Sequence, residues 1–322
     1  MYSLKDVSVI IPTYNRADDL RETLDSFKEI IPKIGEVIVV DQSTEDKTKK
    51  LVQNLKNAKI RYIYSSAPSL TRARNAGIKK ISRLSRIVLF LDDDVSLERY
   101  YFEEILRVFN DNPEALGASG YYLPPEIKMG KTETALRKMF YIEHKSPNSA
   151  RVLSAYGTVY PSVLTKVIMA DWLSGFNMAF KREVFQHEQF DENLSQYALG
   201  EDFDFSYRVH LRRPASLYLT PYAKLIHRVS SVERVPTRKI NYMNQIYHFY
   251  FNFKNFNRTA LQKIAFAWAV FGITILRTWQ FIGCPTLHEG LRLRYYISSL
   301  WYCLKYLSKI RRGEIEIPEN TI

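Results

Sequence analysis

Three consecutive aspartates, Asp92, Asp93 and Asp94, end an apolar run in the first third of the chain. Neighbouring carboxylates repel one another, so something must compensate their charge. In an extended chain Asp92 and Asp94 point to one side and Asp93 to the other. This spacing suits a hard divalent cation, which prefers oxygen ligands. The alternative is a cap, in which Ser96 or Asp94 starts a helix that begins near Leu97. One aspartate suffices for a cap, so the triplet favours a metal site.

A second acidic centre lies at Glu201 and Asp202, at the start of a predicted helix that runs to about residue 212. A carboxylate at this position could act as a general base. It could also be a residue that the helix dipole favours at an N-terminus. Asp204 lies four residues before Arg208, which is the spacing of an ion pair on a helix surface.

Five further side chains could serve a ligand, and each has a plainer alternative. Asp41 could accept a hydrogen bond from a base or a ribose, or form a turn. Arg72 and Arg74 could face a diphosphate, lie in solvent, or pair with the aspartates. Trp172 could stack on a sugar or be structural. His227 could complete the metal sphere or contact the diphosphate, or it could be structural.

The elements that must position these residues alternate between strand and helix as far as about residue 110. Buried strands are predicted at residues 7–12, 36–41, 60–64 and 87–91, and a further short strand at residues 223–226. This alternation is typical of a parallel sheet made of right-handed βαβ units. The polar ends of three strands would then lie along one edge and form a cradle for a nucleotide. Between residues 116 and 166 the pattern is irregular, which favours loops over an acceptor site.

Composition narrows the class of partner. The formal net charge of +12 indicates an anionic partner: a nucleotide, a nucleic acid or an anionic lipid. Neither G-x-G-x-x-G nor a P-loop is present, which disfavours a dehydrogenase or an ATPase. Cys284 and Cys303 are the only cysteines. A disulfide framework is therefore not expected, and a reducing compartment fits.

After residue 235 the composition changes to apolar and basic. The uncharged run 264–276 ends at Arg277 and is too short to span a bilayer, so a membrane-surface or re-entrant element is expected. Residues 293–307 carry an apolar face at helical spacing with basic residues around it, as in helices that lie on anionic lipid. The alternatives are a helical cap on the catalytic core and a dimer interface.

Four segments in the first third occur in the order and at the intervals of a known family: VSVIIPTYNR, EVIVVDQST, TRARNAGI and IVLFLDDDV. They resemble the nucleotide-binding half of the inverting family 2 glycosyltransferases of the GT-A fold. WLSGFNMAFKR, from Trp172, resembles the acceptor-side segment of that family. GEDFDFSYR, from Gly200, resembles its acidic helix motif. The resemblance covers about residues 5–230.

The resemblance implies a role for the donor-side residues. Those that would hold the nucleoside are Pro12, Thr13, Asn15 and Asp41, with Asp41 reading the base. Arg72 and Arg74 remain candidates for the diphosphate. Asp92 would lie near the ribose, and Asp94 would bind a Mg or Mn ion that bridges the diphosphate.

The resemblance also assigns the remaining acidic residues and the histidine. Asp202 would be the base, with Glu201 as its supporting neighbour. His227 would correspond to the late histidine that completes the metal sphere or contacts the diphosphate. Asp93 is acidic where the family pattern is loose; we count it among the residues that bind the nucleotide-sugar, with a secondary electrostatic role.

These observations predict an α/β protein with a GT-A fold, a Rossmann-like mixed sheet with covering helices. The catalytic domain would span residues 1–235, with a nucleotide-binding half at 1–115 and an acceptor half at 116–235. An amphipathic helical tail would span 236–322.

The predicted activity is metal-dependent, inverting transfer of a hexosyl or deoxyhexosyl group from a UDP- or dTDP-sugar. The acceptor would be lipid-linked or a polysaccharide, at the cytoplasmic face of the cell membrane. We expect the chain to attach to an anionic membrane surface as a peripheral or monotopic protein. No nucleic-acid partner is expected, and the sequence allows either a monomer or a homo-oligomer. The alternative is a non-catalytic module of the same fold that binds a nucleotide or a glycan.

Overall fold

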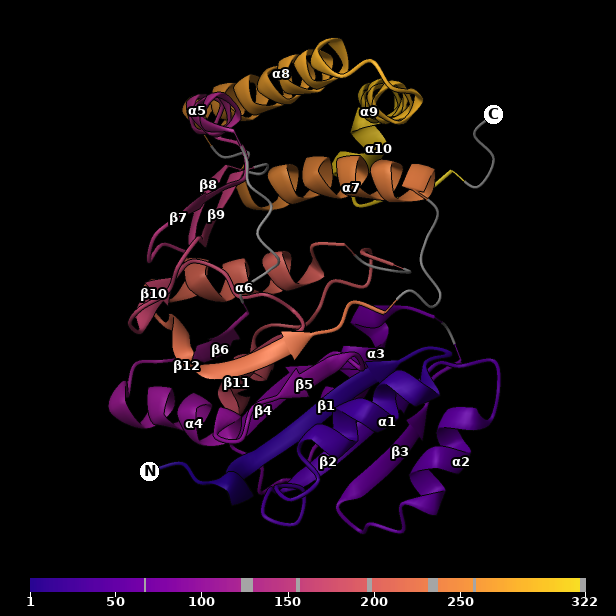
Figure 1. The fold of residues 1–322 in the computed structure, drawn as a ribbon, viewed down its shortest axis with the longest axis vertical. Helices are drawn as coiled ribbons and strands as arrows, with labels where there is room; N and C mark the ends of the chain where they lie inside the picture. The colour runs from indigo at the N-terminus through magenta and orange to yellow at the C-terminus, as the bar shows by residue number, and fades with distance from the viewer. Residues whose placement is uncertain are drawn as a thin grey trace. The chain divides into compact units, whose positions relative to one another are not determined.

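The computed structural model describes residues 1–66, 68–122, 130–154, 157–195, 199–230, 237–256 and 259–318 (Figure 1). The chain divides into two units. The first consists of Met1–Leu123 and Leu164–Arg234, and the second of Pro124–Val163 and Val235–Ile322. The segment 124–163, which the sequence places in the acceptor half, thus groups with the tail.

The first unit is built on one mixed sheet with the strand order β10-β12-β6-β11-β4-β1-β2-β3. Its parallel part consists of β1 (Val7–Thr13), β2 (Glu36–Asp41), β3 (Ile60–Tyr64) and β4 (Ile87–Leu91). The other strands are β5 (Val95–Leu97), β6 (Gly117–Tyr121), β10 (Ile168–Ala170), β11 (Asn177–Lys181) and β12 (Leu217–His227). β11 runs antiparallel to both β4 and β6, so the sheet is mixed as predicted.

Burial explains why these segments form central strands. Every residue of β1, β2 and β4 is buried. Uninterrupted apolar runs of this kind belong to strands that are covered on both faces. The covering helices are α1 (Ala17–Ser26), α2 (Lys47–Asn54), α3 (Leu70–Ile78), α4 (Tyr101–Asp111) and α6 (Glu201–Arg212), with short 3-10 turns at Leu4–Asp6 and Arg182–Gln186. Figure 1 shows α1 and α2 in front of the parallel strands.

Two elements differ from the prediction. The helix expected near Leu97 begins at Tyr101, because residues 95–97 form β5 and pair with β12 instead. Asp94 is therefore not a helix cap. β12 is also longer than the predicted strand, and its register with β6 shifts between Thr220 and Lys224. Pro221 lies in this interval and has no N–H to donate to the ladder.

The second unit contains a small sheet and a group of helices. The sheet has the order β7-β9-β8, with β7 at His144–Ser146, β8 at Arg151–Ser154 and β9 at Gly157–Pro161. The helices are α5 (Lys131–Met139), α7 (Thr237–Phe251), a π-helical segment (Asn252–Phe256), α8 (Ala260–Gly283), α9 (Leu287–Lys305) and α10 (Leu307–Arg311). The expectation of loops between residues 116 and 166 is therefore wrong for α5 and these strands.

α8 also corrects an expectation. It continues through Arg277 and is 24 residues long, so its length and composition would allow it to cross a membrane. Arg277 does not end the helix, since arginine is a good helix former; its side chain is partly buried, and Nη1 donates to Gln280 Oε1 at 3.3 Å.

Candidate active site

Asp92, Asp94 and His227 come together in the first unit, where β4 ends and β12 ends. β5 pairs with β12 in a register that sets Val95 opposite His227, and this register brings the imidazole to Asp94. One ligand atom from each of the three side chains lies within 4.8 Å of the others. The structure therefore brings together the three residues that the sequence proposes as metal ligands.

The hydrogen bonding of Asp94 fits a cation. Its Oδ2 accepts from Ser230 N at 2.8 Å, and its Oδ1 lies 3.0 Å from His227 Nε2. Oδ1 is buried and has no partner with hydrogen-bond geometry among the described residues. Phe176 stacks on the His227 ring at a centroid distance of 4.9 Å and fixes its plane. A buried carboxylate oxygen beside an imidazole nitrogen and a second carboxylate is a suitable donor set for Mg or Mn.

The two aspartates of this group differ in acidity. Burial raises the pKa of Asp92, although Arg74 opposes the effect. Burial also acts to raise the pKa of Asp94, but His227, the Ser230 N–H and Arg16 outweigh it and hold that pKa below its usual value. Asp94 is thus the carboxylate that stays ionised most readily, as a metal ligand must.

Asp93 points away from this group, as predicted, although β4 ends at Leu91 and Asp93 and Asp94 lie in a turn and not in a strand. Its Oδ2 accepts from Thr13 Oγ1 at 2.7 Å, and its Oδ1 pairs with Arg16 at 3.4 Å. Burial raises the pKa of Asp93 to about 7, against the opposing effect of Arg16 and Thr13. Asp93 therefore links the end of β1 to the aspartate segment. Arg16, to which the sequence assigned no role, supplies the nearby positive charge.

Arg74 connects the two acidic centres. Its side chain is only 1% exposed; Nη2 lies 3.2 Å from Asp92 Oδ1, and Nη1 is paired with Glu201. Nη2 also donates to Gly175 O at 2.9 Å. Of the alternatives open to Arg74, the ion pair with an aspartate is the one observed.

Arg72, by contrast, is half-exposed and pairs with Glu192 at 3.4 Å. The structure does not bring it to the aspartates. A pair in this environment contributes little to stability.

Asp202 lies at the first turn of α6, which starts after Gly200 in a left-handed conformation with φ of 80°. Its Oδ2 accepts from Gly175 N at 2.6 Å and its Oδ1 from Phe203 N at 2.7 Å. Burial raises the pKa of the neighbouring Glu201 to about 8, with Asp202 adding to the effect and Arg74 opposing it. Glu201 therefore holds a proton near neutral pH, beside an oriented Asp202.

Gly175 is a site residue that sequence reasoning missed. A Cβ at this position would lie 2.9 Å from Asp202 Cβ and 3.1 Å from both Arg74 Nη2 and Glu201 Oε1. Only a glycine lets the backbone approach all three side chains. Gly175 was quoted within the WLSGFN segment of the sequence but was assigned no role.

The proposed nucleoside residues lie at the ends of β1 and β2, where Thr13 is in register with Asp41. Asp41 forms the turn that was its plainer alternative, because its Oδ1 accepts from Ser43 N at 2.9 Å. Its Oδ2 accepts from the Tyr62 hydroxyl at 2.8 Å, and burial together with this bond raises the pKa of Tyr62. Tyr62 was not singled out by the sequence.

Pro12 is buried in β1. Asn15, which follows β1, forms hydrogen bonds with the loop after β2. Asn15 has a φ of 54°, its N donates to Ser43 Oγ at 2.8 Å, and its Oδ1 accepts from Thr44 N at 3.0 Å. This polar cluster therefore fixes the two strand ends against one another.

Two further residues follow their plainer interpretation. Trp172 is half-buried and packs edge-to-face on Phe203 at 5.8 Å. Asp204 pairs with Arg208 at 3.0 Å with i,i+4 spacing, as predicted.

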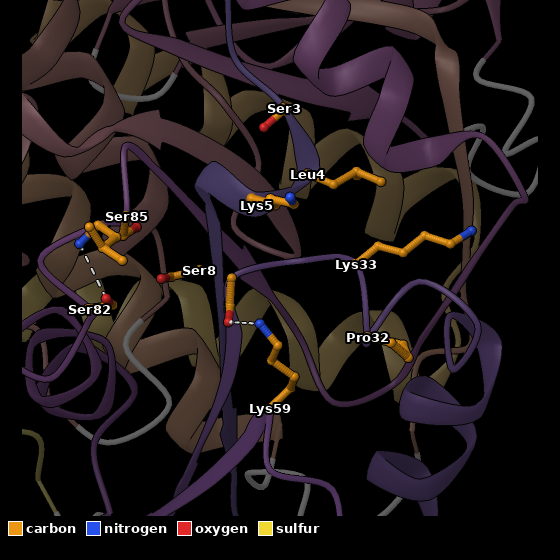
Figure 2. Close-up of a pocket in the computed structure, with 11 residues that line it drawn as sticks. Ser3, Leu4, Lys5, Ser8, Pro32, Lys33, Lys59, Ser82 and Ser85 are labelled. Atoms are coloured by element: carbon orange, nitrogen blue, oxygen red, sulfur yellow. Dashed lines mark hydrogen bonds between the residues drawn. The ribbon is translucent and has the colours of Figure 1, made fainter.

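A surface pocket of about 890 Å³ lies at the amino ends of the parallel strands, away from these carboxylates (Figure 2). It is lined by Ser3, Leu4, Lys5, Ser8, Pro32, Lys33, Gly35, Lys59, Ser82, Leu84 and Ser85. Lys59 Nζ donates to Gly35 O at 3.2 Å in this pocket. None of its lining residues is acidic, so it offers neither a base nor a cation site.

Residues 8–166 match the family model described as Glycosyl transferase family 2. Glycosyltransferase GlyA of Streptococcus pneumoniae serotype 4 is 27% identical over 237 residues, which are 72% of this chain and 32% of that protein. GalNAc(5)-diNAcBac-PP-undecaprenol beta-1,3-glucosyltransferase of Campylobacter jejuni is 26% identical over 196 residues, 58% of this chain and 55% of that protein. The chain thus spans about a third and about half of the length of these relatives.

A solved structure shares the fold. GalNAc-T7, crystallised with UDP, GalNAc and Mn²⁺, superposes with a TM-score of 0.58 over 99% of this chain and 59% of that chain. The sequence identity is 14%, so this likeness concerns the fold alone.

Proposed function

Since the chain belongs to the family 2 glycosyltransferases of the GT-A fold, we propose that it transfers a sugar from a nucleotide-sugar to an acceptor hydroxyl with inversion at the anomeric carbon. One observation carries the proposal. Arg74 contacts Asp92 of the metal-ligand group and also Glu201, the neighbour of Asp202. A leaving-group site and a base site therefore adjoin within one unit.

The donor site would use the polar ends of β1, β2 and β4. Thr13 and Asp41 lie side by side at two of these ends, and Asp92 and Asp94 follow the third. Pro12 and Asn15 would complete the nucleoside side. We propose a UDP- or dTDP-sugar as donor; the UDP in the GalNAc-T7 crystal structure supports this class.

Asp92, Asp94 and His227 would hold a Mg or Mn ion. When bound, such an ion supplies Lewis-acid stabilisation of the departing diphosphate. The buried Asp94 Oδ1, which lies 3.0 Å from His227 Nε2, supports this assignment, and so does the Mn²⁺ in the GalNAc-T7 crystal structure.

Asp202 would remove the proton of the acceptor hydroxyl as its oxygen attacks the anomeric carbon from the face opposite the diphosphate. The N–H groups of Gly175 and Phe203 each donate to one of its oxygens and so fix the plane of the carboxylate. Glu201 keeps its proton near pH 7 and therefore adds no second negative charge beside the base.

The acceptor would be a lipid-linked saccharide or a polysaccharide, and the reaction would take place at the cytoplasmic face of the cell membrane. The name of the Campylobacter jejuni relative, which specifies an undecaprenol-linked substrate, supports a lipid-linked acceptor.

A transfer assay with Asp202→Asn tests the base assignment. We expect a loss of about 10²–10⁴-fold in kcat, whereas Asp111→Asn, an exposed aspartate at the end of α4, should match the wild type. Nuclear magnetic resonance of the product should show the anomeric configuration opposite to that of the donor. Near-normal turnover by Asp202→Asn would refute the base. Nucleotide binding without turnover of any donor would favour a binding module.

A further inference from the structure

α8 exposes an unusually apolar face within the second unit. Large side chains recur along it at intervals of three and four residues, and each is 36–71% exposed: Ile264, Trp268, Phe271, Ile275, Trp279 and Ile282. At 1.5 Å per residue this stripe is about 27 Å long. No described polar side chain interrupts the series at these positions. Exposed apolar surface of this extent indicates an interaction site.

Polar groups in the second half of α8 are bonded within the unit, although Lys263 in its first turn is exposed. Thr274 Oγ1 lies 3.2 Å from the Tyr296 hydroxyl of α9, and that hydroxyl donates to Val270 O at 3.1 Å. Gln280 Nε2 donates to Glu133 of α5 at 3.3 Å. A helix at the surface of a soluble domain shows the reverse arrangement, with its polar side outward. α8 is therefore arranged for an apolar medium on its outer side.

The neighbouring helix α9 indicates what kind of medium this is. Ile297, Trp301 and Leu304 are 51–63% exposed on α9, and the cations Arg294 and Lys305 are exposed on the same helix. Apolar and aromatic residues flanked by cations are typical of helices that lie on anionic lipid. Each copy of this chain carries a formal net charge of +12, and this overall charge favours an anionic surface over a second copy as the partner.

The packing of α5 against α8 decides between crossing and lying on the bilayer. Trp268 Nε1 donates to Met139 O at 2.9 Å, and Gln280 Nε2 donates to Glu133 Oε1 at 3.3 Å, so α5 contacts α8 at two positions that lie twelve residues apart on α8. Gly272 allows this approach, since a Cβ there would lie 2.1 Å from Phe140 Cγ. Figure 1 shows α5 alongside α8.

A transmembrane α8 would carry α5 with it. Glu133 and Arg137, which form a 2.9 Å ion pair on α5, would then enter the hydrocarbon. Charged side chains in that region are costly. An α8 that lies in the membrane plane avoids this cost, because α5 then stays on the aqueous side.

We propose that α8 lies in the plane of an anionic bilayer, with its exposed stripe in the boundary between headgroups and acyl chains and the cations of α9 at the headgroups. This inference names the surface on which the chain works but does not rest on its proposed chemistry. Its test uses no sugar donor, so either proposal can fail without the other.

Tryptophan depth in vesicles distinguishes the two orientations. We would use the full chain with Trp301→Phe and either Trp268→Phe or Trp279→Phe, on phosphatidylglycerol vesicles with bromine at different acyl positions. Trp268 and Trp279 are eleven residues apart, about 16 Å along the helix axis. The in-plane proposal predicts that bromine at the same shallow depth quenches both residues. The midpoint of α8 falls between residues 271 and 272, so a spanning helix would place Trp268 only about 5 Å from the bilayer centre. Stronger quenching of Trp268 by bromine deep in the acyl chains than by shallow bromine would therefore overturn the proposal.

Vesicle co-sedimentation with a matched pair of variants tests whether the stripe is the contact. Ile264→Glu places a charge on the stripe, whereas Leu84→Glu places one at an 82% exposed position in the first unit. We expect Ile264→Glu to lower the partition coefficient at least about tenfold and Leu84→Glu to leave it unchanged. Equal binding by both variants would refute the stripe. Wild-type protein that dimerises without lipid, and that Ile264→Glu makes monomeric, would show a second copy to be the occupant.

Discussion

Gly175→Ala probes the base without removing any functional group. The new Cβ would lie 2.9 Å from Asp202 Cβ, and ordinary contact begins at 3.4 Å, so the two must separate by 3.4 − 2.9 = 0.5 Å. A misplacement of about 1 Å costs roughly 10²-fold in rate, and half of that corresponds to about tenfold, or about 1.4 kcal/mol. We expect kcat to fall about tenfold. The affinity for a nucleoside diphosphate should fall less than kcat, because the contact on the metal side, to Arg74 Nη2 at 3.1 Å, requires a smaller shift than the contact to Asp202 Cβ.

The assay would measure kcat for transfer together with calorimetric binding of the diphosphate in the presence of Mn²⁺. Gly130→Ala is the matched control, since a Cβ there meets nothing within 4 Å and the φ of −60° suits any residue. Equal kcat for Gly175→Ala and wild type would refute the argument that this close approach positions Asp202. A loss of diphosphate binding without a change in kcat would contradict it as well.

Two other perturbations address the buried charges. Arg74→Ala leaves Asp92 without its cation and Glu201 without its hydrogen-bond donor. We therefore expect a loss on the order of 3 kcal/mol in the free energy of unfolding in urea, against less than about 0.5 kcal/mol for Arg72→Ala; similar losses would refute the difference in burial. Burial raises the pKa of Glu201 from 4.5 to about 8, so the folded chain keeps a proton that the unfolded chain releases, and stability falls as pH rises through this range. Glu201→Gln should therefore reduce the fall in thermal stability between pH 5 and pH 8, and an unchanged pH dependence would contradict the raised pKa.

The sequence predicted the parallel half of the sheet well because burial on both faces leaves uninterrupted apolar runs. The strand alternation likewise placed Asp92 and Asp94 on one side and Asp93 on the other, as observed. Local pattern was sufficient for these features, since each depends on residues a few positions apart.

Features that depend on distant residues escaped prediction. β5 exists because residues 95–97 pair with β12, more than 120 positions later, and no local signal distinguishes it from a helix start. Arg74 reaches Glu201 over 127 positions, and Gly175 matters only because α6 folds back against it. The helix α8 extends beyond the predicted apolar run, which ended at residue 276. The polar side chains beyond that residue, among them Arg277 and Gln280, are partly buried or hydrogen-bonded within the second unit.

Metal-dependent binding of a nucleoside diphosphate is the most direct test of the central claim that Asp92, Asp94 and His227 form a cation site beside a separate base. Calorimetry would compare the wild type, Asp94→Ala, Asp202→Asn and the surface control Asp111→Asn, each with and without Mn²⁺. We predict that the wild type, Asp202→Asn and Asp111→Asn bind the diphosphate more tightly with the ion, and that Asp94→Ala loses this gain. Equal Mn²⁺ dependence in Asp94→Ala and wild type would contradict the account.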